Sequence, residues 1–342
     1  MSDSQTLKIA LVGCGGIAQA HWRGIQTHAT QLVVSAVVDT DPDRAAAMAE
    51  QTGGRPFTSV EDALAAGDFA AVDIMLPHNQ HEAAAVAAFA AGKHVVLEKP
   101  MSTNLASCAH SGRGRASRDG LYGGGTGPIL ARCPSSAAVD SRRCYRGDHH
   151  RSCLFRQPGT GNRAHPKPWR YELAQAGGGI TIDGGAHWLR PLRMWLGEVA
   201  EVSAVTGRPL AEMEGESFMR ALLRFDSGVV ALFDTLYGGA VLGPSEEFRV
   251  TGTAGEIISE RGYPGRLLLF NKAHPEGKVL KANLWDGDGR LAAFGYELAD
   301  FAQAVLTGTP LAASPESSLG ELRTALAIYR SAASKQWERV WD

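Results

Sequence analysis

The sequence is poor in the features that mark secreted and membrane proteins. Only five of its 342 residues are cysteine, and this odd, low number argues against a disulfide scaffold of the secreted kind. No stretch approaches the roughly eighteen apolar residues that a membrane span requires. Residues 1–6 are polar and unlike a signal peptide. We therefore expect a cytoplasmic protein.

The chain also lacks an excess of charge of either sign. Its formal net charge is −2 at pH 7 and its isoelectric point is about 6.6, so nothing favours nucleic acid or an anionic membrane as a partner. Hydrophobic residues make up 44% of the chain, which is ordinary for a globular protein with a proper core. A length of 342 residues favours two domains.

The first hundred residues alternate short apolar runs with helical patterns. Strands are predicted at Leu7–Val12, Leu32–Val38, 71–76 and His94–Leu97, and helices at 42–51 and 80–91. Apolar runs separated by alanine-rich helices indicate a parallel sheet that helices cover on both faces. The class predicted for this part is α/β.

A glycine motif, GCGGIA at residues 13–18, lies between the first strand and the helical stretch behind it. Gly13 permits a tight turn, Gly15 lets the backbone approach a pyrophosphate, and Ala18 is small enough for the helix to pack on the sheet. The pyrophosphate would lie at the helix N-terminus, where unpaired N–H groups favour an anion. The motif predicts a dinucleotide-binding loop, and a glycine-rich turn without a ligand is the alternative.

Asp39, at the end of the second predicted strand, indicates which dinucleotide binds. A carboxylate here accepts the ribose hydroxyls of NAD and repels the additional phosphate of NADP. Asp41 adds to the repulsion, and Arg44 is the nearby cation. We therefore expect NAD rather than NADP.

Three further motifs follow: LPHNQH at residues 76–81, LEKP at 97–100 and GGGITIDGGAH at 177–187. Together with the glycine motif they make the chain similar to the glucose–fructose oxidoreductase / inositol dehydrogenase (Gfo/Idh/MocA) family, across about residues 7–104 and 166–335. The resemblance implies an α/β Rossmann domain with a parallel sheet, followed by an α+β domain with an open, mostly antiparallel sheet. We expect the NAD-binding domain over residues 1–125 and the substrate and oligomerisation domain over 126–342.

Alternating runs in the second half suit such a sheet. They lie at 218–225, 229–236, 248–252 and 267–270. The resemblance also implies a homodimer or homotetramer, because the exposed face of this sheet often joins subunits in the family.

The resemblance assigns roles to individual residues. Lys99, Asp183 and His187 match the family's catalytic residues, with Asp183 and His187 as the acid/base pair. The substrate would contact these three residues together with Trp169 and Arg170. The residues expected to bind the cofactor are Gly13, Gly15, Gly16, Ile17, Ala18, Asp39, Pro77, His78, Asn79, His81, Glu98 and Lys99. No metal is expected.

The chemistry of alcohol oxidation suits these residue types independently. Oxidation of a secondary hydroxyl moves a hydride to the nicotinamide and a proton to a base. A histidine, with an ordinary pKa near 6.5, suits a general base at neutral pH, and Lys99 would stabilise the developing alkoxide. Asp183 and His187 are four residues apart and share a face if the stretch is helical. A hydrogen-bonded structural role is the alternative for His187.

The predicted function is an NAD-dependent oxidoreductase that transfers a hydride between nicotinamide and a secondary hydroxyl of a sugar, cyclic polyol or nucleotide-sugar. One alternative is a non-catalytic dinucleotide or sugar sensor of the same fold. Another is an inactive chain, damaged by residues 107–165, whose composition differs from that of the rest. The joint presence of Lys99, Asp183 and His187 favours the enzyme, because a sensor needs no proton path.

The chain departs from the family pattern just after His187. Arg190 stands where the family commonly has an aspartate, and we expect it either to contact an anionic substrate group or to lie in solvent. Pro191 falls inside the expected helix, which it would kink. Lys167 and Arg170, before the glycine run, could line the sugar pocket.

Residues 107–165 differ from the rest of the chain, with four of the five cysteines, ten arginines, no lysine and no glutamate. One hypothesis is a metal site formed by Cys108, His110, Cys133, Cys144, His149, His150 and Cys153. A second is an inserted disordered loop. A third is a frameshift in the coding DNA, since codons read one nucleotide later permit a family-like helix end, turn and strand over residues 140–149. Sequencing the coding DNA across residues 100–170 decides this third hypothesis.

The same shift permits an apolar strand over residues 120–126, which as written lack one. We expect residues 107–165 to be the least ordered part of the chain, because they show no apolar face of helical or strand period. The parallel sheet would then lack its last strand.

Overall fold

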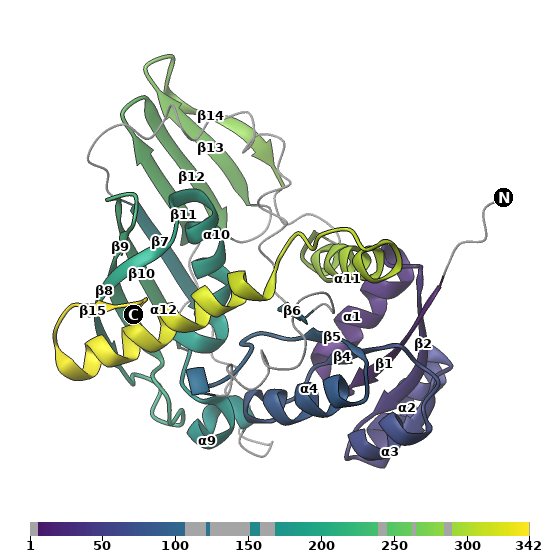
Figure 1. The fold of residues 1–342 in the computed structure, drawn as a ribbon. Helices are drawn as coiled ribbons and strands as arrows, with labels where there is room; N and C mark the ends of the chain where they lie inside the picture. The colour runs from purple at the N-terminus through teal and green to yellow at the C-terminus, as the bar shows by residue number, and fades with distance from the viewer. Residues whose placement is uncertain are drawn as a thin grey trace. The chain divides into compact units, whose positions relative to one another are not determined.

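The computed structural model (Figure 1) describes residues 6–106, 121–123, 151–157, 168–238, 245–261, 265–283 and 289–341. The chain divides into two compact units. The first comprises Met1–Pro128 and Arg290–Leu319, and the second comprises Ile129–Gly289 and Gly320–Asp342. The expected division at residue 125 differs from this one chiefly because residues 290–319 return to the first unit.

The first unit is built on a six-stranded parallel sheet with the strand order β3-β2-β1-β4-β5-β6. The strands are β1 (Leu7–Val12), β2 (Leu32–Val38), β3 (Arg55–Phe57), β4 (Ala71–Ile74), β5 (His94–Leu97) and β6 (Leu121–Gly123). In β1, Ile9 and Leu11 belong to one apolar core, while Ala10 and Val12 belong to a second. A strand buried on both faces is apolar throughout, which is why the sequence predicts the bounds of β1 correctly.

Within residues 6–97, four helices connect these strands: α1 (Gly16–Thr27), α2 (Pro42–Thr52), α3 (Val60–Ala66) and α4 (His81–Ala90). Helix α2 has clear signals at both ends. Asp41 accepts hydrogen bonds from the first N–H groups, Pro42 occupies the first turn, and Gly53 ends the helix with φ 77°. Over the described ranges, every helix is too short or too polar to cross a bilayer.

Helix α11 (Gly289–Thr307) belongs to the first unit although strands β7 to β14 of the second unit precede it in the chain. It lies beside α1 (Figure 1), and the two helices meet at Gly24 and Gly295. A Cβ at Gly24 would lie 2.7 Å from the backbone nitrogen of Gly295, so a larger residue would separate the helices. Leu298 and Phe301 are fully buried in the core that contains Ile9. Helix α11 therefore completes one face of the parallel sheet.

The second unit is built on a nine-stranded sheet with the order β14-β13-β12-β11-β7-β10-β9-β8-β15. The strands are β7 (Arg151–Gln157), β8 (Val199–Gly207), β9 (Phe218–Phe225), β10 (Val230–Tyr237), β11 (Ser245–Gly252), β12 (Gly255–Arg261), β13 (Arg266–Asn271), β14 (His274–Ala282) and β15 (Glu338–Arg339). All neighbouring strands are antiparallel except β7 and β10, which are parallel. The structure confirms the expected fold class.

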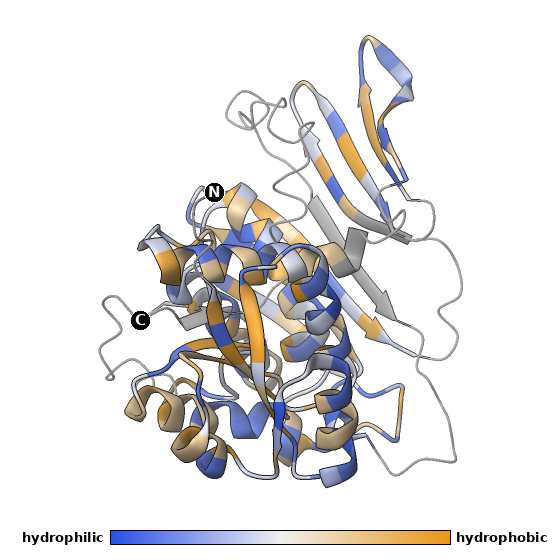
Figure 2. Cartoon of the chain, turned by 90° about the vertical axis from the view of Figure 1, so that its right-hand side faces the viewer, coloured by the Kyte–Doolittle hydropathy of each residue, from blue (hydrophilic) through white to orange (hydrophobic). Residues whose placement is uncertain are grey.

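Helices α10 (Ala186–Leu196) and α12 (Pro315–Ser334) pack on this sheet. Along β9, buried and exposed side chains alternate from Met219 to Phe225. The buried set shares one core with Leu189 of α10 and Ile328 of α12. Figure 2 shows the alternation as bands of apolar and polar colour along the strands. This strict period of two explains why β9 was predictable residue by residue.

The expectation that the parallel sheet lacks its last strand is wrong. Strand β6 pairs with β5 and completes the parallel sheet, at 121–123 within the region where a frame-shifted strand was considered. Strand β7 lies between β10 and β11 inside the second sheet. The remainder, 107–120, 124–150 and 158–165, lies outside the described residues, as do Lys167 and the side chains of the cysteine–histidine metal hypothesis.

Candidate active site

The glycine motif forms the turn from β1 into α1, at the carboxyl end of the parallel strands. Gly13 has φ +95°, which side chains rarely adopt, and a Cβ there would lie 2.6 Å from the carbonyl oxygen of Met75. Gly15 is the N-cap of α1 and makes no side-chain capping bond. The first N–H groups of α1 therefore have no side-chain cap.

The surface at the start of α1 lets a ligand come close to the backbone. Gly15 and Gly16 are exposed, and a Cβ on either would meet nothing within 4 Å. Ile17 is half-buried, while Ala18 is fully buried. An open glycine surface over an uncapped helix N-terminus fits the pyrophosphate of a dinucleotide, because N–H groups and the helix dipole favour an anion there.

Asp39 lies directly after β2, half-buried beside this turn. Its carboxylate accepts hydrogen bonds from the N–H groups of Cys14 and Asp41, both at 2.9 Å. Each carboxylate oxygen has a second lone pair, so the group can still accept ribose hydroxyls. Asp39 is thus held at the position where the carboxylate of a dinucleotide site is needed.

Asp41 has a structural role beside the one expected. It caps α2 and forms an ion pair with Arg44, whose Nε lies 2.9 Å from Oδ2 of Asp41. The hydrogen bond from Arg44 holds the pKa of Asp41 below its ordinary value. Because the two charges offset each other, repulsion of an NADP phosphate depends on Asp39.

The LPHNQH motif divides into exposed and buried members. Pro77 is half-exposed and Asn79 exposed at the turn before α4, whereas His78 and His81 are buried. The ring nitrogens of His81 lie 2.9 Å from the carbonyl oxygen of Pro100 and 2.8 Å from that of Leu76.

Burial lowers the pKa of His81, so the neutral ring donates through one nitrogen. Through the carbonyl groups of Leu76 and Pro100, His81 links the loop that follows β4 to the loop that follows β5. The His81 ring is fully buried, and its expected role in binding the cofactor stays a prediction.

Lys99 follows β5 and is half-exposed, while Glu98 before it is buried. Glu98 Oε2 accepts a hydrogen bond from the backbone N–H of Lys99 at 3.2 Å. Its other oxygen lies 3.1 Å from Nε2 of His21, and Nδ1 of His21 lies 2.7 Å from Oδ2 of Asp73. His21, buried on α1, thus links the carboxylate of Asp73 on β4 to that of Glu98. Glu98 in turn binds the backbone N–H of Lys99.

His21 and Asp73 were not among the residues predicted from the sequence. A histidine within an amphipathic helix carries no distinctive signal, but an aspartate inside the apolar run AVDI does. A buried charge requires a partner, so Asp73 predicts a cation or donor without saying that His21, 52 residues away, supplies it. Asp73 was thus the detectable sign of the network that holds the backbone of Lys99.

Burial alone would lower the pKa of His21, but the Asp73 and Glu98 carboxylates outweigh it and raise the pKa well above its ordinary 6.5. The folded protein then binds a proton that the unfolded chain releases. This stabilisation is complete below about pH 6.5 and is lost as the pH rises through the raised pKa of the folded state.

We therefore expect the thermal unfolding temperature to fall as the pH rises from 6.5, and His21→Gln to flatten this dependence. Thermal scans at a series of pH values measure it. His274→Gln, in the second unit, is the control and should keep the parent slope. An identical slope in His21→Gln would contradict the assignment.

Asp183 lies in a π-helical turn, η3 (Thr181–Gly185), that leads into α10. Such turns are uncommon and are frequent at functional sites. The Asp183 carboxylate accepts a hydrogen bond from Nε of Arg170 at 3.0 Å, and the Arg170 guanidinium lies over the ring of Trp169 at 4.3 Å. Trp169 and Arg170 belong to the short helix η2 (Trp169–Tyr171). The structure thus brings three of the expected substrate-site residues together.

His187, the second residue of α10, is half-buried and lies edge-on to Trp188, with 5.9 Å between ring centroids. It belongs to the second unit with Asp183, and Lys99 belongs to the first. Pro191 lies inside α10, as expected, and the helix runs on to Leu196.

The expectations for Arg190 are wrong. Its side chain is 4% exposed and forms a two-pronged ion pair with Glu321 of α12, with one contact at 3.2 Å between Nη2 and Oε2. It therefore neither lies in solvent nor faces a substrate. The departure from the family's aspartate is explained by a structural contact between two helices.

Among the residues that the structure describes, no three histidine, cysteine, aspartate or glutamate side chains cluster as metal ligands. In the second unit, Asp183, His187 and Arg170 supply a carboxylate, an imidazole and a cation, groups of the kinds that suit proton transfer.

Two family models match the chain. Residues 7–119 match "Oxidoreductase family, NAD-binding Rossmann fold", and residues 149–258 match "GFO/IDH/MocA C-terminal domain". The first match covers the glycine loop and Lys99, and the second covers the start of α10 with Asp183 and His187.

Individual proteins agree with these models. A 1,5-anhydro-D-fructose reductase of Ensifer adhaerens is 29% identical over 355 aligned residues, which cover 95% of this chain and 96% of that protein. An inositol 2-dehydrogenase of Leifsonia xyli is 38% identical over 106 residues, 31% of each chain. The crystal structure of the WlbA dehydrogenase from Bordetella pertussis, in complex with NADH and UDP-GlcNAcA, shares the fold with a TM-score of 0.82 at 22% identity, covering 99% of both chains. The chain is therefore an oxidoreductase of the GFO/IDH/MocA family, with that family's NAD-binding Rossmann fold.

Proposed function

We propose that the chain is an NAD-dependent dehydrogenase that acts on a secondary hydroxyl of a sugar, cyclic polyol or nucleotide-sugar. The relatives named above support this substrate class, since one is named for an anhydro-sugar and another for inositol. When bound, the nicotinamide takes or returns the hydride. The protein's own residues then supply the route for the proton.

In the proposed reaction His187 takes the proton of the substrate hydroxyl, and in the reverse direction it returns that proton. Asp183 stabilises the imidazolium that forms. Lys99 stabilises the alkoxide as the hydroxyl loses its proton. Arg170 and Trp169 contact the sugar, with Arg170 also placing a cation beside Asp183 at 3.0 Å.

The observation that carries the proposal is the exposure pattern at the start of α10. From residue 181 to residue 186, every residue except Asp183 is buried, and His187 follows half-exposed. A carboxylate and an imidazole are thus the groups that this turn presents outward. A sensor would gain nothing from an acid/base pair here, so the pattern favours catalysis.

Activity is tested by following NADH formation at 340 nm with myo-inositol, hexoses and anhydro-sugars. The reverse assay follows NADH consumption with 1,5-anhydro-D-fructose. We expect turnover with at least one compound, and a rate lower by at least about a hundredfold in the His187→Ala control. Saturable sugar binding by calorimetry without turnover in either direction would favour the sensor instead.

NAD should bind at least about tenfold more tightly than NADP, a difference of about 1.4 kcal/mol, because the Asp39 carboxylate repels the additional phosphate. Titration calorimetry with both dinucleotides measures the preference. Asp39→Asn should reduce the preference for NAD over NADP. Asp41→Asn should change this preference less, since Arg44 offsets the charge of Asp41. Equal or tighter binding of NADP would overturn this assignment.

The proposal includes a cytoplasmic location and a homodimer or homotetramer. Support for the assembly comes from exposed apolar side chains on the second sheet, with Val205, Leu222 and Leu232 exposed by 60%, 41% and 37%. Light scattering on the purified chain measures the oligomeric state, and a monomer would contradict it.

A further inference from the structure

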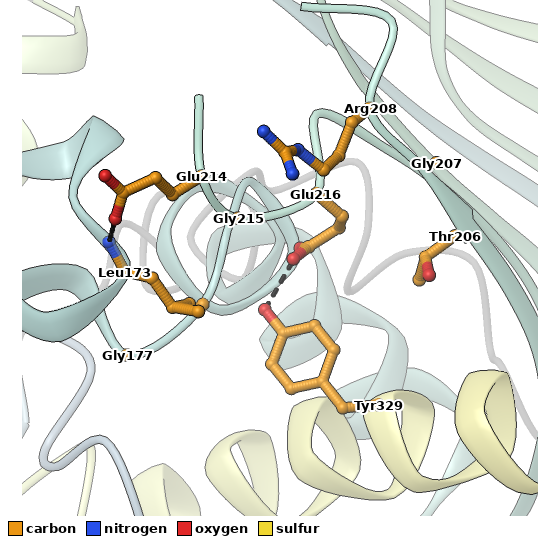
Figure 3. Close-up of a pocket in the computed structure, with 10 residues that line it drawn as sticks. Leu173, Gly177, Thr206, Gly207, Arg208, Glu214, Gly215, Glu216 and Tyr329 are labelled. Carbon is orange, nitrogen blue, oxygen red and sulfur yellow. Dashed lines mark hydrogen bonds between the residues drawn. The ribbon is translucent and has the colours of Figure 1, made fainter. Parts of the chain in front are cut away.

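A cavity of about 490 Å³ in the second unit lies beside the glycine run that precedes Asp183 (Figure 3). Its charged side chains bind other parts of the protein. Nε of Arg208 donates to the carbonyl of Met213 at 3.0 Å, and Glu214 accepts from the N–H of Leu173 at 2.8 Å. The residues of the cavity wall therefore matter for the backbone segments that they hold in place.

Two residues of this wall, Glu216 and Tyr329, bind the backbone at the start of η3. Oε2 of Glu216 accepts a hydrogen bond from the N–H of Gly179 at 2.8 Å, and Oε1 accepts one from the N–H of Thr181 at 2.9 Å. The Tyr329 hydroxyl accepts from the N–H groups of Gly179 and Ile182, both at 3.2 Å. These are N–H groups at a helix start, which need partners from outside the helix.

The two side chains also bind each other, as Figure 3 shows. The Tyr329 hydroxyl donates to Oε1 of Glu216 at 3.0 Å. Burial and the Glu216 carboxylate raise the pKa of Tyr329, so the hydroxyl keeps the proton that it donates. The pair therefore acts as one cap, built from Glu216, two residues before β9, and from Tyr329 of α12.

The glycines of the motif allow this contact. A Cβ at Gly179 would overlap the backbone oxygen of Glu216, and one at Gly178 would overlap the Tyr329 hydroxyl. A Cβ at Gly215 would lie 2.6 Å from the carbonyl carbon of Gly178. The backbone before Asp183 is thus pressed directly against the loop that carries Glu216.

We propose that Glu216 and Tyr329 are positioning residues that hold η3 in one conformation and thereby fix the orientation of Asp183 and His187. The proposal rests on the proposed function, because only a proton transfer at this turn gives the orientation a catalytic consequence. The cap binds the N–H groups of residues 179, 181 and 182, immediately before Asp183. Misplacing a reacting group by about 1 Å can cost about a hundredfold in rate.

The test uses Tyr329→Phe, which removes the hydroxyl and keeps the ring, and Glu216→Gln, which keeps the shape and turns an N–H donor toward backbone N–H groups. With the substrate found in the activity screen, kcat should fall by about ten- to a hundredfold, with a smaller change in KM. NAD affinity should be unchanged, because the glycine loop belongs to the other unit.

A second measurement does not depend on turnover. In protein labelled with ¹³C-histidine, the His187 ring signal, identified by its loss in His187→Asn, should broaden or split in both variants. Glu214→Gln is the matched control, because Glu214 lines the same cavity and binds a backbone N–H outside η3. It should keep the parent kcat and a single His187 signal.

Parent kcat and a single His187 signal in folded Tyr329→Phe would overturn the proposal. The proposal would also be overturned if the fall in activity only matched the loss of folded protein, because the two residues would then have a merely structural role. If His187→Asn retains turnover, the proposed role of His187 as the base fails, while the His187 signal of the parent and the cap variants still reports whether the cap holds the turn. Should Glu216→Gln not fold, Tyr329→Phe decides.

Discussion

His187→Ala should lower kcat by at least about a hundredfold, the usual scale for losing a positioned acid/base group, and leave NAD affinity nearly unchanged. The hydroxyl proton then has no base at the start of α10, where His187 is half-exposed beside Asp183. The cofactor loop lies in the other unit and contains no part of α10. Initial rates with varied substrate, together with NADH fluorescence titration, separate the two effects.

Lys99→Ala should lower kcat on a similar scale, because the alkoxide loses its cation. Lys93 is the matched control: its Nζ donates to the carbonyl of Phe69 at 2.7 Å, so Lys93→Ala should keep the parent kcat. Both should be measured in this chain and in a form whose coding frame is restored across residues 107–165. Near-parent turnover in His187→Ala would remove that histidine from the mechanism.

The parts of the fold that were predictable are those in which local pattern and tertiary role agree. Strands β1 and β2 are apolar runs because both of their faces are buried, and β9 alternates because one face is buried. The glycine loop was predictable because Gly13 meets a backbone constraint that only glycine satisfies readily. In each case the residue's immediate neighbours in sequence carry the information.

What was missed depends on partners distant in sequence. The apolar stripe of α11 shows that the helix is buried, but the sheet it covers is decided by the Gly24–Gly295 contact. Arg190 looks like a solvent or substrate residue until Glu321, 131 residues away, is seen beside it. The same holds for the cap on η3, since Glu216 and Tyr329 are 113 residues apart. The local sequence shows which chemical group a position carries, but it does not show which distant residue that group contacts.

The largest stability effect is expected at Arg190. Arg190→Met leaves the Glu321 carboxylate, 6% exposed, without its two-pronged partner. Removing one member of a buried ion pair typically costs about 3–5 kcal/mol. Arg193 lies 3.6 Å from the same carboxylate and can compensate in part, so we expect a loss near the lower end of that range. Urea unfolding followed by tryptophan fluorescence suits the measurement, because Trp188 and Trp195 lie on α10.

The double variant Arg190→Met/Glu321→Leu identifies the cause. If the cost is that of an unpartnered buried charge, removing both charges should restore much of the free energy of unfolding, because apolar replacements of a buried pair are often neutral or stabilising. Arg193 keeps its contacts with Glu198, at 2.7 and 2.8 Å, in this variant. Arg266→Met is the control, since Arg266 forms an equally two-pronged pair with Glu260, at 2.7 Å, but on the surface. Solvent screens such pairs, so its effect should be far smaller. A double variant no more stable than Arg190→Met would show that Arg190 acts through packing and not through charge.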